Sequence, residues 1–495
     1  MPKLQHKQTF TSPGWVYLTG ISSMQIVPTN GGTTLYIGSK AYGGILGLSL
    51  SEGQSGSFLG AWAVPGRGSS FLLEDMAWIT INGAPRLIVA ETASPHIERF
   101  DIGLDGRLGA SFALLDANAP AVSRIATLAT SGDPVLFSNA PGVAGMTSFR
   151  LSNSGTATLS ATQADSPKSA VADGGELLVL TNSGGNFVVT ASQQEGALST
   201  FRSDATGALS LVDTIGAKEG LWLAGLDTIV SVQADGKSYL VIGGLLSSTL
   251  SVVRVNPMGV MFVSDHIIDS LYTRFAQVDA LASFAAATRG FVLAGGSDDG
   301  LSLLEILPDG QLFHHQALAQ SSGQTLTNIS AIAATVVGNE AQIFVSGATH
   351  GVTQFTFALG MLAPPILGAA HSEQLTGDAR DDILFGGDGA DTLTGGAGDD
   401  LLFGQGGADR LIGGAGADIF IFDSDISRDQ INDFERGIDR IDLSRWDDIY
   451  HVGALVLRSR PTGADLICGE LSVRIQTLDG TPLGQDFLVS DNFIF

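Results

Sequence analysis

The sequence predicts an all-β protein in which a seven-bladed β-propeller precedes a parallel β-roll and a C-terminal β domain. Two internal repeats carry this prediction. Short apolar runs recur seven times within residues 1–360, and a nine-residue unit recurs five times without a gap within residues 377–421. Repeats of constant period are typical of propellers and solenoids, because each copy buries its apolar face against the next. We therefore expect two repeat architectures in one chain.

The longer repeat consists of apolar runs such as TLYIGS and RLIVAET, each bounded by glycine and polar residues. Successive runs are 52, 48, 52, 52, 52 and 52 residues apart. One alternating strand precedes each run and two follow it, with triplets such as LDG, ATG and PDG where a hairpin turn belongs. Seven units of four strands predict a propeller, whereas stacked sandwich domains would not explain so constant a step. The second residues of the runs are Leu35, Leu87, Val135, Phe187, Tyr239, Phe291 and Ile343.

The seventh unit lacks an outer strand of its own. After its third strand the chain runs into Met361-Leu362-Ala363-Pro364-Pro365, which cannot continue a sheet interior. The segment near His6 to Ser12 lies one strand ahead of the first unit, so we expect it to complete the seventh blade and remove an exposed edge. Residues 361–376 are then expected to be a linker.

The shorter repeat follows the pattern GGxGxDxUx, with aspartate at the sixth position and a large apolar residue at the eighth. Its glycines suit a tight turn with positive φ, and its last three residues suit a short strand whose middle side chain points inward while its neighbours face out. Two units make one turn of a coil. Asp382, Asp400 and Asp418 should therefore share one edge, and Asp391 and Asp409 the other. The expected inward residues are Leu384, Leu393, Leu402, Leu411 and Phe420.

A hard cation that prefers six to eight oxygen ligands fits between stacked turns, where aspartates and glycine-turn carbonyls meet. Each pair of adjacent aspartates on the same edge defines one site. There are three such pairs: Asp382 with Asp400, Asp400 with Asp418, and Asp391 with Asp409. A flexible acidic linker, the alternative, has no reason to keep this register. The pattern therefore predicts calcium at the five aspartates and at the turn glycines Gly377, Gly386, Gly387, Gly389, Gly395, Gly396, Gly398, Gly404, Gly406, Gly413, Gly414 and Gly416.

Charge is concentrated where the short repeats lie. Residues 371–450 hold 19 of the 50 Asp and Glu but 6 of the 25 Lys and Arg, so this stretch carries −13 of the net charge of −25. Without a cation these carboxylates repel one another, so the roll should fold when calcium is supplied. Nucleic-acid binding would need a basic surface that the sequence lacks. The single cysteine, Cys468, excludes an intramolecular disulfide framework.

Features of the sequence that bear on location point in two directions. The N-terminal twenty residues lack the apolar stretch and cleavage site of a secretory signal, and no run is long enough to span a membrane. These features alone suggest the cytosol. The repeats favour the outside of the cell, where calcium is millimolar and modules of modest affinity are filled.

From residue 372 to 495 the chain resembles RTX (repeats-in-toxin, hemolysin-type calcium-binding repeat) proteins of Gram-negative bacteria. The resemblance rests on the five nonapeptides and on DQINDFERGIDRIDLS (429–444), and the tail is similar to the C-terminal domain of serralysin-type secreted proteases. It implies an extracellular protein exported by a type I (ABC transporter) system, with the uncleaved signal in residues 422–495. The HExxH zinc motif of such proteases is missing from the sequence.

The longer repeat is similar to that of lactonase-type seven-bladed propellers, a resemblance of periodicity and hairpin style that implies the fold without an active-site motif. Loops joining the second and third strands should emerge on one face, where propellers usually bind ligands. Glu91, His96 and His350 lie on these loops and are the candidate general acids and bases. Ordinary solvated loop residues are the alternative. The adjacent His314 and His315 should face opposite sides of a strand and so cannot bind one ion together.

Three functions fit these observations. The first is a secreted, calcium-binding protein whose propeller binds an extracellular ligand without catalysis. The second is a secreted lactonase-like hydrolase that uses the propeller mouth, and the third is a calcium-dependent, surface-associated structural protein. The sequence favours the first, leaves enzymatic activity open and names no ligand.

Overall fold

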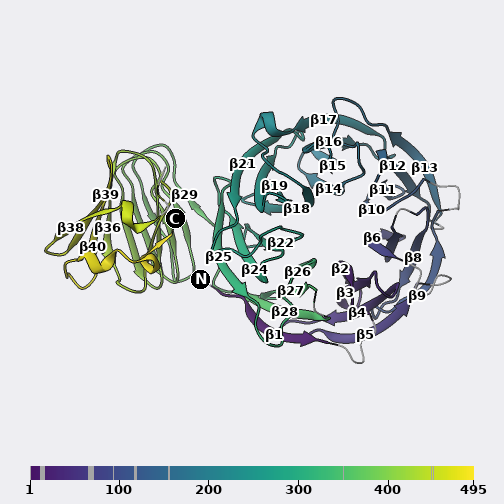
Figure 1. Ribbon diagram of the computed structural model, residues 1–495, viewed down its shortest axis with the longest axis horizontal. Coiled ribbons are helices and arrows are strands. Elements are labelled where there is room, and N and C mark those ends of the chain that lie inside the picture. The colour runs from purple at the N-terminus through teal and green to yellow at the C-terminus, as the bar shows by residue number, and fades with distance from the viewer. Residues whose placement is uncertain are drawn as a thin grey trace. The chain divides into compact units, whose positions relative to one another are not determined.

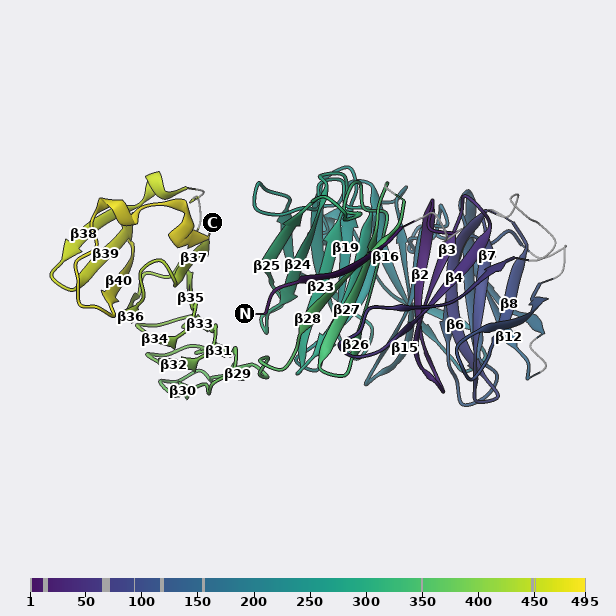
Figure 2. The same cartoon turned by 90° about the horizontal axis from the view of Figure 1, so that it is seen from below.

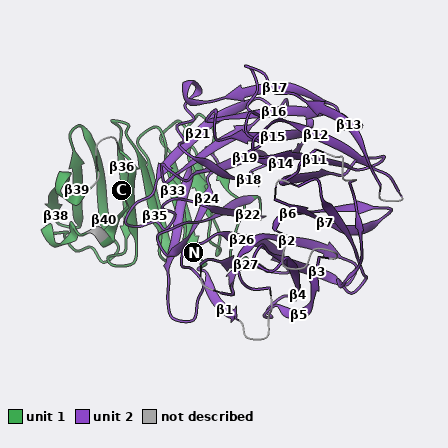
Figure 3. Ribbon diagram, turned by 45° about the vertical axis from the view of Figure 1, so that its right-hand side comes forward, with its two compact units in different colours: residues 1–2, 286–288, 359–495 green, residues 3–285, 289–358 purple. Residues whose placement is uncertain are grey.

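The computed structural model describes residues 2–11, 17–64, 72–92, 94–115, 120–153, 156–348, 350–446, 449 and 451–494. The chain divides into two compact units (Figure 3). One unit holds residues 3–285 and 289–358, and the other holds residues 359–495 together with residues 1–2 and 286–288. No helix in the described part of the chain is long and apolar enough to cross a membrane.

The larger unit is a seven-bladed β-propeller, as the sequence predicts (Figure 1). Each blade is a four-stranded sheet, and around the ring axis the first strands of successive blades contact one another from the seventh blade through the first to the fifth. From the axis outward, the first three blades are β2 (Ile21–Thr29), β3 (Gly32–Ser39), β4 (Gly44–Leu50) and β5 (Ser57–Ala63); β6 (Leu73–Ile81), β7 (Ala84–Glu91), β8 (Ile97–Ile102) and β9 (Leu108–Ala113); and β10 (Arg124–Leu128), β11 (Val135–Ala140), β12 (Val143–Leu151) and β13 (Ala157–Gln163).

The next three blades repeat this order. They are β14 (Glu176–Asn182), β15 (Gly185–Ser192), β16 (Ala197–Ser203) and β17 (Leu209–Ile215); β18 (Leu226–Ala234), β19 (Lys237–Gly244), β20 (Thr249–Val255) and β21 (Met261–Ile268); and β22 (Ala280–Ala286), β23 (Arg289–Gly295), β24 (Gly300–Ile306) and β25 (Leu312–Ala319). A short 3-10 helix, η2 (Ala217–Glu219), precedes the fifth blade. All seven residues that mark the longer repeat lie in second strands and are at most 1 % exposed, which confirms the phase read from the sequence.

The seventh blade joins the two ends of the propeller segment. It contains β26 (Ala331–Val337), β27 (Glu340–Ser346), β28 (Val352–Ala358) and, as its outer strand, β1 (Gln5–Phe10). β1 runs antiparallel to β28, with Phe10 opposite Val352. The expected closure by the N-terminal segment is therefore confirmed for β1, while Ser12 lies outside the described residues. The pairing gives β28 a partner at its outer edge.

Glycines in the outer hairpins allow both the turn and the contact between blades. Gly106, Gly207 and Gly310, in the LDG, ATG and PDG triplets, have φ of 81°, 86° and 90°, a range that side-chain-bearing residues rarely adopt. Gly259 occupies the same place in the fifth blade, where a Cβ atom would overlap the ring of Phe187 in the fourth. The hairpin turn thus packs directly on the second strand of the preceding blade.

The sixth blade contains a buried group of charged side chains. Glu305 on β24 accepts hydrogen bonds from Arg289 Nε at 2.6 Å and from Arg289 Nη2 at 2.8 Å, and its Oε2 lies 2.5 Å from His315 Nε2. Each of these side chains is at most 4 % exposed. Burial acts to raise the pKa of Glu305, but Arg289 and His315 outweigh it and lower the pKa to about 2. The carboxylate is therefore ionised and held by two partners. His315 thus serves as a partner of this buried carboxylate.

The smaller unit is a β-solenoid made of two sheets (Figure 2). In the first sheet all strands are parallel, in the order β29 (Ile366–Leu367), β31 (Ile383–Phe385), β33 (Leu401–Phe403), β35 (Ile419–Asp423), β37 (Arg440–Arg445) and β41 (Phe493–Ile494). The second sheet has the order β30 (Gln374–Thr376), β32 (Thr392–Ala397), β34 (Arg410–Ala415), β36 (Arg428–Phe434), β40 (Leu471–Thr477), β39 (Gly463–Cys468) and β38 (Val456–Arg460), of which the last three are antiparallel.

The solenoid extends beyond the boundaries expected from the sequence. β29 and β30 lie within residues 361–376, the expected linker, and form the first coil. Residues 422–495 share one apolar core with the repeats instead of forming a separate domain, because Ile431 and Ile441 pair in register with Leu411 and Phe420. The remaining regular elements are η3 (Val452–Ala454), η4 (Gln485–Phe487) and η5 (Ser490–Asn492).

The inward column of the roll is as predicted, since all five expected residues are fully buried. Their neighbours in β31 and β33, which were expected to face out, are also buried. Phe385 and Phe403 pack edge to face with ring centroids 5.0 Å apart, and the Arg445 guanidinium lies 4.2 Å from the centroid of Phe403. The prediction failed here because all four outer side chains of β31 and β33 are large and apolar, whereas Thr392, Thr394 and Arg410 on β32 and β34 are polar and stay partly exposed.

Candidate functional site

Glycine-rich turns connect the short strands of the solenoid and set the spacing of its coils. Gly387, Gly396 and Gly414 occupy equivalent positions with φ of 91°, 122° and 99°, and Gln405 takes the same place with φ of 66°. A Cβ atom at Gly414 would overlap the carbonyl oxygen of Gly396 in the adjacent coil. At Gly414 glycine is therefore favoured both by the backbone conformation and by the close stacking of coils, whereas Gln405 adopts the smaller φ of 66° at the equivalent position.

The aspartates at the sixth position stack along both edges, as predicted. On one edge Asp400 Oδ1 accepts a hydrogen bond from the amide of Asp382 at 2.8 Å, and Asp418 Oδ1 accepts one from Asp400 at 2.9 Å. On the other edge Asp409 Oδ1 accepts from the amide of Asp391 at 2.8 Å. One carboxylate oxygen of each pair thus fixes the register of successive coils.

The second carboxylate oxygen is buried without a partner in four of these residues. Oδ2 of Asp391, Asp400, Asp409 and Asp418 makes no hydrogen bond, although each residue is at most 1 % exposed. Leaving such an acceptor unsatisfied costs about 1–3 kcal/mol or more for a charged group. An oxygen-seeking cation between the coils would satisfy these atoms. No cluster of three or more His, Cys, Asp or Glu side chains in metal-binding geometry occurs among the described residues, and the gaps between repeats offer carboxylates together with backbone carbonyls.

Burial and mutual repulsion disfavour ionisation of the stacked carboxylates. Burial, followed by the charges of Asp418 and Asp382, raises the pKa of Asp400 to about 7. The pKa values of Asp409 and Asp418 rise to about 6, again chiefly through burial. A bound cation would reverse the balance by favouring the charged form. The edges of the solenoid therefore concentrate negative charge that is incompletely compensated by the protein.

Both edges also contain acidic residues that sequence reasoning missed. Glu373 donates its amide to Asp391 Oδ1 at 2.7 Å, Asp429 Oδ1 accepts from the amide of Asp409 at 2.9 Å, and Asp439 Oδ1 accepts from Asp418 at 3.0 Å. The last two were missed because they follow their neighbours by 20 and 21 residues instead of 18. The signal was present in the apolar residue two positions later, Ile431 and Ile441, the offset seen in every nonapeptide.

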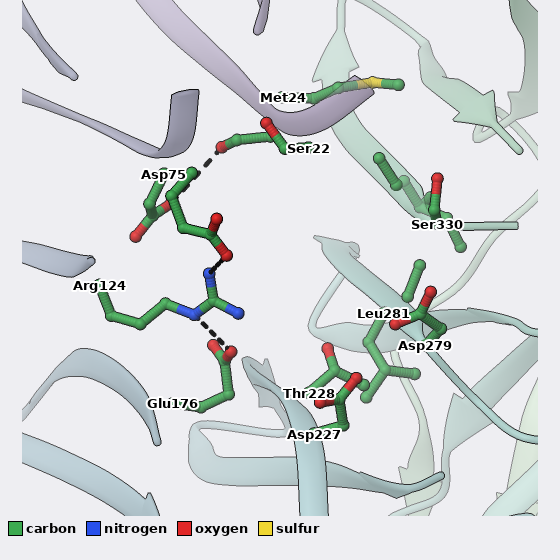
Figure 4. A pocket seen from close by; sticks show the side chains of 15 residues that line it. Ser22, Met24, Asp75, Arg124, Glu176, Asp227, Thr228, Asp279, Leu281 and Ser330 are labelled. Carbon is green, nitrogen blue, oxygen red and sulfur yellow. Dashed lines mark hydrogen bonds and ion pairs between the residues drawn. The ribbon is translucent and has the colours of Figure 1, made fainter. Parts of the chain in front are cut away.

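A second candidate site is a pocket of about 280 Å³ in the propeller, at the starts of the first strands (Figure 4). This end of each blade also carries the loop between the second and third strands, because the first strand begins opposite the end of the second. Sequence reasoning missed the pocket. A signal existed, since Asp75, Asp227 and Asp279 each stand 12 residues before a marker of the longer repeat. The charged residues that line the pocket are Glu74, Asp75, Arg124, Glu176, Asp227 and Asp279.

Arg124 lies between two carboxylates of this pocket. Its Nη1 is 3.1 Å from Glu74 Oε1 and its Nε is 2.7 Å from Glu176 Oε1, and Lys40 Nζ reaches the second oxygen of Glu74 at 2.5 Å. Burial opposes ionisation of Glu74, but hydrogen bonds from Lys40 and Thr92 and the charge of Arg124 keep its pKa below the usual value. Burial raises the pKa of Glu176 to about 7 despite Arg124.

Asp227 and Asp279 form a second acidic pair in the pocket. Partial loss of hydration, followed by a hydrogen bond and the charge of Asp227, raises the pKa of Asp279 to about 7. Asp75 accepts the amide hydrogens of Met76 and Ile125 at 2.8 and 3.0 Å. With one arginine among five carboxylates, the pocket becomes more negative as the pH rises through 7.

The three candidate catalytic residues do not form one constellation. Glu91 is the last residue of β7 and His96 lies on the loop that follows it in the second blade, where the Glu91 amide donates to the His96 carbonyl at 3.4 Å. Glu91 Oε2 is buried without a hydrogen-bond partner. His350 is exposed on the corresponding loop of the seventh blade, with the first blade in between. Their catalytic role stays a prediction.

Comparison with known families supports the repeat assignment. The RTX calcium-binding nonapeptide repeat, in four copies, matches residues 367–402 and 395–426. The matched residues form the coils from β29 to β35, which include the stacked aspartates. The chain therefore contains RTX calcium-binding repeats, a class of repeat that implies calcium binding and is typical of secreted proteins. A search of curated proteins found no match.

Proposed function

We propose that this calcium-binding RTX-type protein is exported by a type I secretion system and that its propeller binds a ligand outside the cell without catalysis. The unpartnered Oδ2 atoms of the stacked aspartates carry the calcium assignment. Carboxylate and carbonyl oxygens are the ligands that calcium prefers, and its flexible coordination suits gaps between coils. The turn glycines place their carbonyls beside these atoms.

Calcium also supports the proposed location and route. The solenoid, which carries this charge concentration, folds poorly in the low calcium of a cell interior and folds where calcium is millimolar. This delay in folding would keep the C-terminal part of the chain unfolded while it passes through an exporter. The presence of RTX repeats, typical of secreted proteins, points the same way.

Calorimetric titration of the full chain with calcium tests the metal assignment. We expect the wild type to bind several calcium ions and Asp400→Asn to bind fewer, because Asp400 borders two gaps on its edge. Asn keeps the acceptor for the Asp382 amide but removes the charge. Asp479→Asn, in an exposed turn of the same unit, is the matched control and should bind as the wild type does. Absence of calcium binding to the wild type would contradict the assignment.

The pocket of the propeller is our proposed ligand site. Lys40 and Arg124 together compensate Glu74 and Glu176, which leaves Asp227 and Asp279 to attract a cation. The shape and charge suit a small ligand with an ammonium group. A lactonase-like hydrolase is the second candidate, favoured because Glu176 and Asp279 have pKa values of about 7 and are suited to accept a proton near neutral pH.

Titration with 1,4-diaminobutane tests the pocket. Binding should strengthen between pH 6 and pH 8, because Asp279 and Glu176 lose their protons in that interval. Asp227→Asn/Asp279→Asn should weaken binding at least tenfold, while Asp133→Asn, whose partner is the exposed Arg150, should not. Equal binding by the double variant would contradict this site. Hydrolysis of γ-butyrolactone that the same double variant abolishes would instead support the hydrolase.

A further inference from the structure

We infer that the ligand of the propeller is an amphipathic amine, whose ammonium group binds in the acidic pocket and whose apolar chain lies in a second cavity beside the ring axis. The second cavity has a volume of about 480 Å³ and is lined mostly by the first strands of four blades, β2, β6, β10 and β14. The inference rests on the proposed ligand binding by the acidic pocket and adds the class of ligand that would fill both spaces.

The two cavities meet at shared carboxylates. Asp75 and Glu176 line both of them. Burial raises the pKa of Glu176, and the charges of Asp75 and Asp227 add to this effect, so Asp227 lies close to Glu176 (Figure 4). Asp227 is in turn hydrogen-bonded to Asp279. A cation held by Asp227 and Asp279 therefore lies beside the residue at which the second cavity begins.

The walls of the second cavity differ in chemistry from those of the acidic pocket. Beyond the two shared carboxylates, its described lining residues are uncharged, and most of them are apolar side chains of β6, β10 and β14. Thr127 on β10 uses its hydroxyl group within the wall, where Oγ1 donates to the carbonyl of Trp78 at 2.7 Å. The charged end of a ligand would find no counter-charge here, whereas an apolar chain would be well accommodated.

Apolar side chains beside the axis remain partly exposed to this cavity. Trp78, Leu178 and Val179 lie on innermost strands but are half-buried. Each packs with its other side against the core between two blades, which fixes it in place. Strands rise about 3.3 Å per residue, so the wall of β14 runs roughly 10 Å from Glu176 to Val179. An alkyl chain along this wall would remove the exposed apolar surface from water.

Neither cavity alone has the composition of a usual ligand site. Such sites occupy about 300–1,000 Å³ and combine apolar walls with a few polar groups that orient the ligand. The acidic pocket, of about 280 Å³, supplies the orienting groups, and the second cavity supplies the apolar walls. A short diamine would leave the second cavity to water, and an uncharged apolar ligand would leave Asp227 and Asp279 without a cation. An amine with an apolar chain satisfies both.

Calorimetric titration of the full chain at pH 8 in saturating calcium, with n-butylamine, n-hexylamine and n-octylamine, tests this inference. Each methylene group that leaves water strengthens binding up to about fourfold, so n-octylamine should bind at least about tenfold more tightly than n-butylamine. Leu178→Asn should remove most of this ratio, because it places an amide in the apolar wall. Leu211→Asn, at an exposed leucine on the outer strand of the same blade, is the matched control and should keep the ratio.

The outcomes separate the class of ligand from the function on which it rests. A wild type that binds 1,4-diaminobutane and n-butylamine, but n-octylamine no more tightly, would overturn the inference and leave the acidic pocket as the ligand site. A wild type that binds none of these amines would overturn both. Equal binding of n-octylamine by the wild type and by Asp227→Asn/Asp279→Asn would place the ammonium group elsewhere and also overturn the inference. If Leu178→Asn loses its cooperative unfolding, the chain-length series of the wild type decides alone.

Discussion

Removal of calcium is expected to unfold residues 359–495 while the propeller stays folded. The aspartates along the solenoid edges then have buried oxygens without a partner and repel one another. Calcium at 100 times its dissociation constant stabilises a site by about 2.7 kcal/mol, so three independent sites contribute about 8 kcal/mol. This is comparable to the whole stability of a domain. The propeller contains none of these sites and has its own core.

Differential scanning calorimetry of the full chain measures this effect. In millimolar calcium two transitions are expected, and in chelator the one from the solenoid should shift down strongly or disappear. The pH dependence in chelator has a defined sign. Because Asp400 and Asp418 have folded pKa values of about 7 and 6, above the usual 3.8, the apo solenoid loses stability as the pH rises from about 4 to 7. Transitions that do not respond to calcium would contradict the assignment.

Glu305→Gln is expected to destabilise the propeller by about 3–5 kcal/mol, because it leaves the fully buried Arg289 without its counter-charge. The double variant Arg289→Met/Glu305→Gln should lose less, since it buries no unpaired charge. The contribution of Glu305 also depends on pH. Its pKa is about 2 in the folded state, so the stabilisation is complete above the unfolded value near 4.5 and is lost as the pH falls toward 2.

Urea unfolding of the full chain in saturating calcium measures both variants. Asp309→Asn, in the exposed turn between β24 and β25, is a control in the same blade and should change the free energy of unfolding by less than about 0.5 kcal/mol. If Glu305→Gln were as stable as the wild type, or less destabilised than the double variant, the side chains would not act as a charged group.

Periodic features could be predicted from the sequence, because they depend on local patterns. The seven marker residues located the second strand of every blade, and the nonapeptides located the inward column and the stacked aspartates. The outer limits of the solenoid were missed because its terminal coils keep the apolar positions but not the glycines, as at Ile431 and Ile441. The apolar core positions therefore continue along the chain beyond the last glycine-rich turn of the repeats.

The pocket of the propeller could not be predicted from any single blade. Arg124, Glu176 and Asp279 come from three different blades and meet because the ring brings the starts of their first strands together. The repeat period identifies the ring, and the shared offset of 12 residues before a marker picks out Asp75, Asp227 and Asp279, but the period does not point to Arg124 or Glu176. Each such residue is an ordinary polar residue within its own unit.

The outer strand of the seventh blade has a kinetic consequence. Gln5 pairs with Thr356, so this sheet has a very high contact order, a property that slows folding. At synthesis rates of about 5–20 residues per second, β1 leaves the ribosome roughly 20–70 s before β28 exists. Throughout that interval an unpaired strand must avoid other chains. Closure of the ring by β1 and β28 is therefore expected to be a late step in assembling the propeller.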